Sequence, residues 1–175
     1  MSAEMNFLLW LQTAHRDWLT PVMIFITELG NAGFIWILTG VILLIPEKTR
    51  KCGAVMLAAL AFSFLTGNLI IKNLVGRERP FIRNGAVPLL IPAPSGFSFP
   101  SGHTLSSFTA ATVLFLFHKG AGTGAYILAA LIAFSRMYLF VHFPTDILAG
   151  ILLGVLDGAL VFLAMRRAER KVDKR

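Results

Sequence analysis

Residues 146–175 read DILAGILLGVLDGALVFLAM followed by RRAERKVDKR. The first twenty residues are almost entirely apolar, and about 20 such residues are what an α-helix needs to cross the hydrocarbon core of a bilayer. The ten residues after Met165 contain six of the sixteen lysines and arginines in the chain. Basic clusters beside apolar spans are typical of cytoplasmic segments. This stretch therefore predicts a membrane helix with a basic cytoplasmic tail at 166–175.

The composition of the whole chain indicates the same environment. Hydrophobic residues make up 56% of the 175 positions and charged residues 14%, against about 25% charged in a typical soluble domain. A soluble chain of this size has too much surface to cover with so few charges. The composition excludes a disordered chain, a soluble enzyme and a disulfide-stapled secreted module, and the lone Cys52 has no partner for an internal disulfide.

Five apolar segments are predicted to span the membrane, and all must be helices because lipid offers no partner to backbone groups. They are residues 31–45, 52–71, 103–118, 123–141 and 146–165. The first is expected to continue an apolar stretch that starts at Trp18. Residues 1–30 predict an interfacial helix followed by a turn, or alternatively an imperfect sixth span. We therefore expect an all-α integral membrane protein of five or six transmembrane helices, with residues 1–175 forming one domain and no removable signal peptide.

The basic residues also predict how the helices are oriented. If the tail and the basic loop at 46–51 are cytoplasmic, the long connection at 72–102 faces outward. Arg77, Arg79 and Arg83 lie in that outer loop, against the usual charge bias. Such a departure indicates that these arginines serve something anionic. Nucleic acid is not the expected partner, because aromatic and basic residues do not interleave on any polar stretch.

Three polar clusters lie at the predicted outer ends of the helices, where they could share one site. The first is KNLVGRERP at 72–80. Lys72 supplies a point charge and Arg79 a planar fork suited to phosphate or carboxylate. The alternative for Lys72 is a side chain that only snorkels at a helix end.

The second cluster is PSGH at 100–103, immediately before an apolar helix. Ser101 is expected at the N-cap and Gly102 lets a ligand approach the backbone. Free N–H groups and the helix dipole favour an anion at such an end. His103 can exchange a proton near neutral pH, although a capped helix with an incidental histidine is the alternative.

The third cluster is SRMYLFVHFPTD at 135–146. Arg136 lies within an apolar stretch, where a structural ion pair or the phosphate of a ligand would explain it. His142 and Asp146 are four residues apart, and a carboxylate beside an imidazole fixes its tautomer and frees the other nitrogen to attack. An Asp–His pair can also bind metal. Nucleophilic catalysis is favoured, because nearby Lys and Arg side chains would repel a metal ion.

Together, K-x6-R-P, P-S-G-H and S-R-x5-H-x3-D occur in that order. Over about residues 20–165 the chain resembles the type 2 phosphatidic acid phosphatase (PAP2) superfamily of membrane lipid phosphatases. The resemblance implies that His142 attacks phosphorus, Asp146 orients it, and His103 protonates the leaving oxygen and then activates water. It further implies that the phosphoryl oxygens are held by Lys72, Arg79, Ser101, Gly102 and Arg136. No metal and no cofactor are implied.

The resemblance also implies a substrate and a location. The expected substrate is a phosphorylated lipid, first undecaprenyl diphosphate and alternatively phosphatidylglycerophosphate or phosphatidate. The expected location is a bacterial-type inner membrane, with the site facing outward. A transporter or channel with Arg136, Asp157 and Glu28 along a pathway is the alternative from another class, but the polar residues gather at one face. The oligomeric state is not predicted.

The remaining polar and small residues have structural interpretations. Asp157 lies eleven residues after Asp146, about 16 Å away at helical rise, so an interhelical hydrogen bond or a protonated acid is expected. The glycine stripe of α-helical spacing predicts close helix packing; it consists of Gly150, Gly154 and Gly158. Glu28 is a candidate for steadying the arginines of the site. His15 and His118 are interpreted as interfacial bystanders.

Overall fold

The apolar segments form helices in the computed structural model, which describes residues 2–172 and contains no β-strand in that range. The elements are α1 (Ala3–Gln12), α2 (Leu19–Leu29), η1 (Asn31–Gly33), α3 (Phe34–Leu44), α4 (Glu47–Ser63), η2 (Phe64–Ile71), α5 (Lys72–Val75), α6 (Pro80–Arg83), α7 (Gly102–Phe117), α8 (Lys119–Tyr138) and α9 (Pro144–Val172). The last three residues of the predicted basic tail lie outside the described residues. The tail as far as Val172 continues α9 without a break.

The apolar stretch that runs from Trp18 into the first predicted span forms two helices joined at a bend. α2 and α3 meet at 45° across the short 3-10 turn η1. Ala32 and Gly33 have φ values of 52° and 70°, in the left-handed region that interrupts a regular helix. The apolar stretch from Trp18 thus continues into residues 31–45, as the sequence predicts, but it changes direction on the way.

The second span is longer than predicted and is wound irregularly. α4, η2 and α5 follow one another without a break from Glu47 to Val75. The middle portion, η2, is a π-helix, in which each turn holds more residues than in an α-helix. The first four residues of the predicted outer loop at 72–102 are therefore helical, and Lys72 stands at the start of α5.

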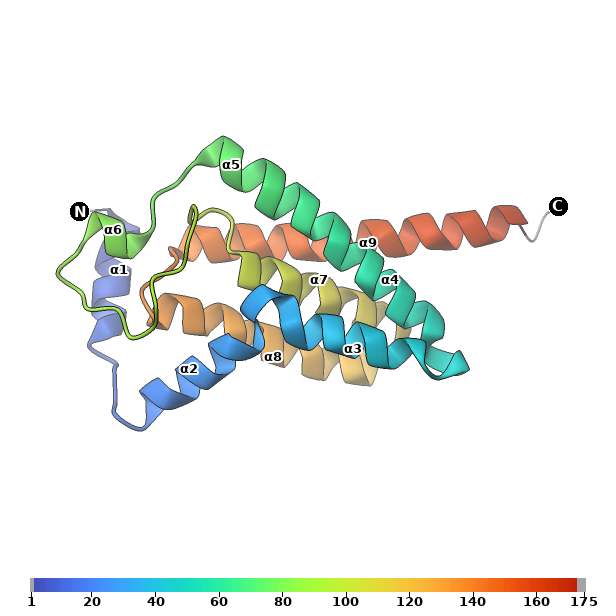
Figure 1. Ribbon diagram of the computed structural model, residues 1–175, viewed down its shortest axis with the longest axis horizontal. Coiled ribbons are helices and arrows are strands. Elements are labelled where there is room, and N and C mark those ends of the chain that lie inside the picture. The colour runs from blue at the N-terminus through green and yellow to red at the C-terminus, as the bar shows by residue number, and fades with distance from the viewer. Residues whose placement is uncertain (1, 173–175) are drawn as a thin grey trace.

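The helix α7 lies at the centre of the bundle, between α4, α8 and α9 (Figure 1). Its 16 residues measure about 24 Å at helical rise, which is less than the roughly 30 Å of the hydrocarbon core of a bilayer. From Thr104 to Leu114, every side chain except that of Ser106 is buried. Because α7 touches protein on all sides, it does not need the length of a helix that is bathed in lipid.

The predicted span at 123–141 ends too late. α8 ends at Tyr138, and residues 139–143 form a loop before α9. Phe140 has a φ of 60°, which a continuing helix cannot accommodate, and Pro144 disfavours helical backbone at Phe143 before it. His142 consequently lies in the buried loop at 139–143, between α8 and α9.

Three helical stretches of the described chain are long and apolar enough to cross a membrane: the one that begins at Glu47, Lys119–Tyr138 and Pro144–Lys171. The bent pair of α2 and α3 counts as a fourth if it is taken as one span. The all-helical membrane fold is confirmed. α1, with ten residues, is too short to cross a bilayer.

One face of α9 is exposed and the other packs against α7. One face exposes a row of leucines at helical spacing, which suits lipid rather than water; it consists of Leu148, Leu152, Leu156, Leu160 and Leu163. The other face carries the glycine stripe against α7. A β-carbon on Gly154 would lie 2.7 Å from the backbone oxygen of Leu105, and one on Gly158 would lie 2.8 Å from that of Thr109. The glycines therefore set the close approach of the two helices.

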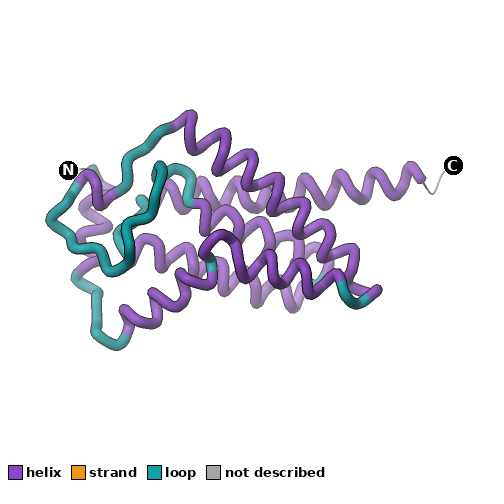
Figure 2. The backbone as a smooth tube through the Cα atoms, in the orientation of Figure 1, coloured by secondary structure: helices purple, strands orange, loops and turns teal. Residues whose placement is uncertain are grey.

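The longest non-helical segments gather at one end of the bundle, whereas the short turn between α3 and α4 lies at the other. Figure 2 shows the loops around α6 at the end where the N-terminus lies, whereas α9 carries the C-terminus to the opposite end. α1 lies at the same end as these loops (Figure 1). Each of the three polar clusters is thus brought to one end of the helices.

Replacing Gly154 by Ala should destabilise the bundle by about 1–3 kcal/mol, the usual result of overpacking a tight contact. The added carbon meets backbone, which cannot move aside as a flexible side chain can. Thermal unfolding of the purified protein in detergent measures the effect. Gly124→Ala is the control, because nothing lies within 4 Å of a β-carbon at that exposed position of α8. Equal melting temperatures for the two variants would contradict the packing argument.

Candidate active site

A buried carboxylate and imidazole form the centre of the polar end. Asp146, in the first turn of α9, and His142, in the preceding loop, are both almost fully buried. Nδ1 of His142 lies 3.4 Å from Oδ2 of Asp146 and 3.3 Å from the hydroxyl of Ser98. The same Oδ2 accepts hydrogen bonds from Ser98 and from the backbone N–H of Phe143. The carboxylate is therefore held in place by both neighbouring segments.

These contacts determine the form of the His142 ring. An ionised carboxylate only accepts hydrogen bonds, so the proton belongs on Nδ1 and the lone pair on Nε2. Burial lowers the pKa of His142 to about 3, although the hydrogen bond with Asp146 acts in the opposite direction. At pH 7 the imidazole is neutral, with Nε2 available as a nucleophile.

Arg79 places a cation directly at that nitrogen. Its Nη1 lies 3.2 Å from Nε2 of His142 and also donates to the carbonyl of Val141. The carbonyls of Gly96 and Ser95 accept the other hydrogen bonds of the guanidinium. The outer loop thus wraps around Arg79, which is nearly buried and forms none of the salt bridges among residues 2–172.

Arg136 has even fewer partners. It is 2% exposed, and it donates to the hydroxyl of Thr27 on α2. Its Nε has no hydrogen-bond partner among the described residues. The structural ion pair that the sequence left open is absent from the salt bridges of residues 2–172. A buried guanidinium without an anion is costly, so an anionic ligand would stabilise this side chain.

Lys72 completes the set of cations. Its Nζ donates to the carbonyls of Phe97, at 3.2 Å, and Pro100, at 3.0 Å. Both carbonyls belong to the segment that leads into α7. The ammonium group is therefore turned inward, and the alternative that Lys72 only snorkels at a helix end does not describe its position.

Ser101 and Gly102 begin α7 next to Asp146. Ser101 occupies the N-cap, but its hydroxyl makes no capping hydrogen bond to the helix backbone; it accepts one from the hydroxyl of Thr104 at 3.0 Å. Its backbone N–H donates to the carbonyl of Asp146 at 3.1 Å, which ties α7 to α9. At Gly102, a β-carbon would lie 2.7 Å from Oδ1 of Asn68, so a larger residue would not fit there.

His103 faces the same cluster from the first turn of α7. Its Nε2 lies 2.9 Å from Oδ1 of Asn31, in the bend between α2 and α3. The charges of three cations of the site act on its ring, those of Arg136, Arg79 and Lys72. The bend at Gly30 thus positions the second histidine, and a β-carbon on that glycine would lie 2.9 Å from the ring.

Several residues of this end were missed by sequence reasoning. Ser98, Asn31, Asn68 and Thr27 are common polar residues outside the motifs, and nothing in their spacing distinguishes them. Glu4 had a clearer signal, because it is the one acid in an otherwise apolar N-terminal helix. It forms a salt bridge of 2.6 Å with Arg77 of the outer loop.

The polar residues with structural interpretations mostly behave as expected. Oδ2 of Asp157 accepts a hydrogen bond of 2.9 Å from Thr66, so the expected interhelical contact is present. Glu28 is exposed and forms none of the salt bridges of residues 2–172, so it does not steady the arginines; the neighbouring Thr27 contacts Arg136 instead. His15 is no bystander, since its Nε2 lies 2.9 Å from the carbonyl of Tyr138 and thereby anchors the turn after α1.

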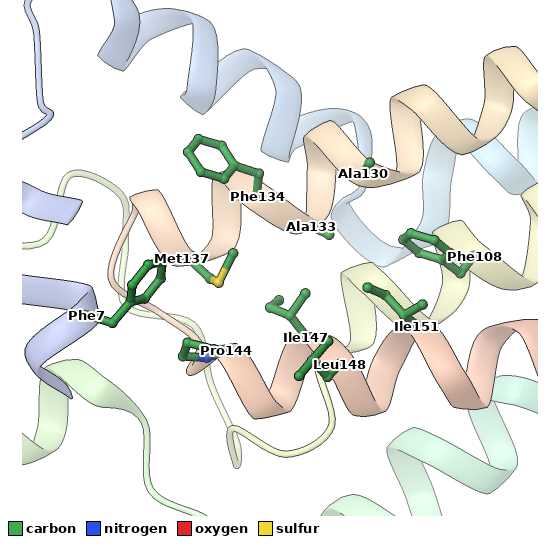
Figure 3. A pocket seen from close by; sticks show the side chains of 10 residues that line it. All are labelled: Phe7, Phe108, Ala130, Ala133, Phe134, Met137, Pro144, Ile147, Leu148 and Ile151. Atoms are coloured by element: carbon green, nitrogen blue, oxygen red, sulfur yellow. The ribbon is translucent and has the colours of Figure 1, made fainter. Parts of the chain in front are cut away.

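An apolar hollow of about 350 Å³ lies apart from this chemistry, between α8 and α9 (Figure 3). Ile147 and Ile151 point from α9 toward α8, and Phe7 of α1 closes one end. None of its lining residues ionises. This hollow therefore offers no side chain for acid–base or nucleophilic chemistry.

The arrangement is that of a site for an anionic group. The lone pair of a neutral imidazole faces Arg79, and the buried Arg136, the inward-turned Lys72 and a second histidine lie at the same end of the bundle. Fixed cations that neutralise negative oxygens are the main requirement of phosphoryl transfer.

The model of the PAP2 superfamily matches residues 52–170. This range covers more than half of the chain and contains every residue of the three motifs. The chain belongs to the PAP2 superfamily.

Individual relatives agree with this assignment. The chain is 35% identical over 137 residues to an undecaprenyl-diphosphatase from Sulfolobus acidocaldarius, covering 78% of this chain and 66% of that protein. It resembles the crystal structure of a PAP2 type phosphatidylglycerolphosphate phosphatase from Bacillus subtilis at 30% identity, with a TM-score of 0.78 over 94% of this chain and 85% of that one. It also resembles LpxE from Aquifex aeolicus at 26% identity, with a TM-score of 0.80 over 93% and 96% of the two chains. The predicted class, a PAP2-type hydrolase of the membrane, is confirmed.

Inorganic phosphate should raise the melting temperature of the protein in detergent, because it binds the folded site and not the unfolded chain. At a hundred times its dissociation constant, a ligand of this kind stabilises by about 2.7 kcal/mol. Arg136→Gln should lose most of the shift, since the buried guanidinium has no other anion. Lys51→Gln is the control, because Lys51 is an exposed cation paired with Glu169. A full shift in the Arg136 variant would contradict the assignment.

Proposed function

We propose that the protein is a metal-independent lipid phosphate phosphatase that works through a phosphohistidine on His142. The observation that carries the proposal is the lone pair of His142 facing cations with no carboxylate of their own. Arg79 lies at that nitrogen, and Arg136 is buried beside it with one nitrogen unpartnered. A phosphoryl group placed there meets the nucleophile and the positive charge together.

In the first step, the lone pair on Nε2 of His142 forms a bond to phosphorus while the bond from phosphorus to the leaving oxygen breaks. Positive charge develops on the imidazole, and Asp146 stabilises it through Nδ1–H. Lys72, Arg79 and Arg136 hold the phosphoryl oxygens, with Ser101 and the backbone N–H of Gly102. His103 donates a proton to the leaving oxygen, and the bound phosphoryl group neutralises the cations that surround that histidine.

In the second step, water attacks the phosphohistidine and the bond from nitrogen to phosphorus breaks. His103, now without its proton, takes one from the water, and inorganic phosphate leaves. One histidine thus serves first as general acid and then as general base. Splitting the hydrolysis in two replaces one difficult step by two easier ones.

We further propose undecaprenyl diphosphate as the substrate, which would yield undecaprenyl phosphate. The support is the similarity to the Sulfolobus protein that carries this name. Phosphatidylglycerophosphate is the second candidate, because of the similarity to the Bacillus structure, and phosphatidate shares the same phosphate chemistry. The polar end of the bundle suits all three, because the lipid chain can stay in the bilayer while the phosphate enters.

The proposed setting is a bacterial-type inner membrane crossed by five helical spans, with α7 as the short central one. The six basic residues after Met165 favour a cytoplasmic C-terminus. The site is at the other end of the bundle from that terminus (Figure 1). It would therefore face outward, where the basic outer loop meets the lipid headgroups.

His142→Ala should abolish phosphate release and leave the melting temperature within a few degrees of the native protein. His103→Ala should also lose turnover, because it removes the acid of the first step and the base of the second, but it should still form phosphohistidine because the nucleophile remains. Acid-labile, base-stable phosphate on the protein, measured after brief exposure to labelled substrate, distinguishes the two. His118→Ala is the matched control, since it changes an exposed histidine at the opposite end of α7. Turnover in a folded His142 variant would refute the nucleophile.

Purified protein in detergent with EDTA should release phosphate from undecaprenyl diphosphate with a higher kcat/KM than from phosphatidylglycerophosphate or phosphatidate. The chelator tests the metal-free scheme in the same assay, because the fixed cations do the work of a metal ion. Faster release from phosphatidylglycerophosphate would select the second candidate. Release from none of the three lipids would favour a transporter or channel, and release that depends on added divalent metal would contradict the scheme.

A further inference from the structure

The N-terminal helix α1 packs on the loop that carries His142. Met5 and Leu8 are buried against Phe140 and Phe143, which flank the histidine in the loop at 139–143. Trp10 on the same helix is largely exposed, as expected for a helix lying at the membrane surface. α1 therefore joins the catalytic loop to the edge of the bilayer.

A polar contact accompanies this apolar one. Oε1 of Glu4 accepts hydrogen bonds from the hydroxyl of Thr145, at 2.6 Å, and from its backbone N–H, at 3.0 Å. Burial by itself would raise the pKa of Glu4, but the hydrogen bonds from Thr145 and the charge of Arg77 outweigh it and lower that pKa. Glu4 is thus an anion fixed at the start of α9, one residue from Asp146.

Arg77 connects Glu4 to the catalytic pair. Its Nη2 lies 2.6 Å from Oε2 of Glu4, and its Nη1 lies 2.7 Å from Oδ1 of Asp146. The guanidinium also stacks on the ring of Phe143, 4.1 Å from its centre. Two carboxylates and an aromatic face therefore surround Arg77, in contrast to Arg79 and Arg136, and its charge is neutralised within the protein.

We infer that Glu4 is a positioning residue for the reaction, acting through Arg77 and Thr145 to hold the carboxylate of Asp146 against His142. The inference rests on the proposed function. Asp146 has two oxygens, one facing His142 and one facing Arg77. Fixing the second oxygen fixes the angle of the first, and Glu4 is what keeps Arg77 from turning toward bulk water or toward the incoming phosphate.

This role predicts that loss of Glu4 changes kcat and not KM. The groups that bind phosphate are Lys72, Arg79 and Arg136, and Glu4 contacts none of them among the described contacts. Losing Glu4 should therefore slow the chemical step and leave substrate binding unchanged. Loss of a hydrogen-bonded partner of this kind typically costs about tenfold or more in activity.

The experiment compares kcat and KM for phosphate release by the purified full-length protein. Glu4→Gln should lower kcat about tenfold with KM within twofold of the native value. Glu4→Asp keeps the charge and should recover part of the lost kcat. Adding Glu4→Gln to Arg77→Met should lower kcat no further than Arg77→Met alone, because both changes interrupt one chain of contacts.

Glu78→Gln is the matched control, since Glu78 is an exposed acid in the same outer loop and lies 3.6 Å from Arg83; it should keep native kcat. A native kcat in Glu4→Gln, a rise in KM without a fall in kcat, or independent effects in the double variant would each overturn the inference. If Glu4→Gln does not fold, the Glu4→Asp variant and the Arg77→Met variant still test the kinetic split. A native protein that releases no phosphate would instead refute the proposed function itself.

Discussion

The carboxylate of Asp146 is the contact that holds the polar end together. A buried anion must be fully hydrogen-bonded to be tolerated, and this one draws donors from separate parts of the chain. Ser98 and Arg77 donate from the outer loop, and His142 and the backbone N–H of Phe143 donate from the loop at 139–143. The adjoining backbone carbonyl accepts from Ser101 at the start of α7. Satisfying one side chain thereby fixes the relative positions of all three motifs.

The cations of the site are held by neutral groups rather than by opposite charges. Lys72 and Arg79 donate to backbone carbonyls, and Arg136 donates to a hydroxyl. Carbonyl dipoles orient a cation but do not cancel its charge, so positive potential remains where the imidazole lone pair points. Arg77, in contrast, is neutralised by the carboxylates of Glu4 and Asp146. The charge of Arg77 is thus cancelled within the protein, whereas the charges of Lys72, Arg79 and Arg136 are not. The low dielectric constant of the buried surroundings strengthens the electrostatic interactions of both groups.

The sequence predicts the parts of this arrangement that depend on period, hydropathy and motif spacing. The helices are predicted from hydropathy, and the eight candidate site residues between Lys72 and Asp146 are predicted from the motifs. The end of α8 at Tyr138 was missed because Leu139 to Val141 are as apolar as a span, and only the backbone at Phe140 interrupts it. The N-cap position of Ser101 is confirmed, but its hydroxyl accepts a hydrogen bond from Thr104 and makes none to the helix backbone. Glu4 was missed because its partners are more than 70 residues away in the chain.

The π-helical winding of η2 has a consequence for the direction in which Lys72 points. An α-helix turns by about 100° per residue, and wider turns rotate less for each residue added. Over the eight residues from Phe64 to Ile71, the difference accumulates, so Lys72 faces another side of the bundle than it would at the end of a regular helix. Removing a single residue from this stretch would keep the span apolar and yet swing the ammonium group out of register with its carbonyl ligands. The angular phase of the helix is thus as much a determinant of the site as the identity of the lysine.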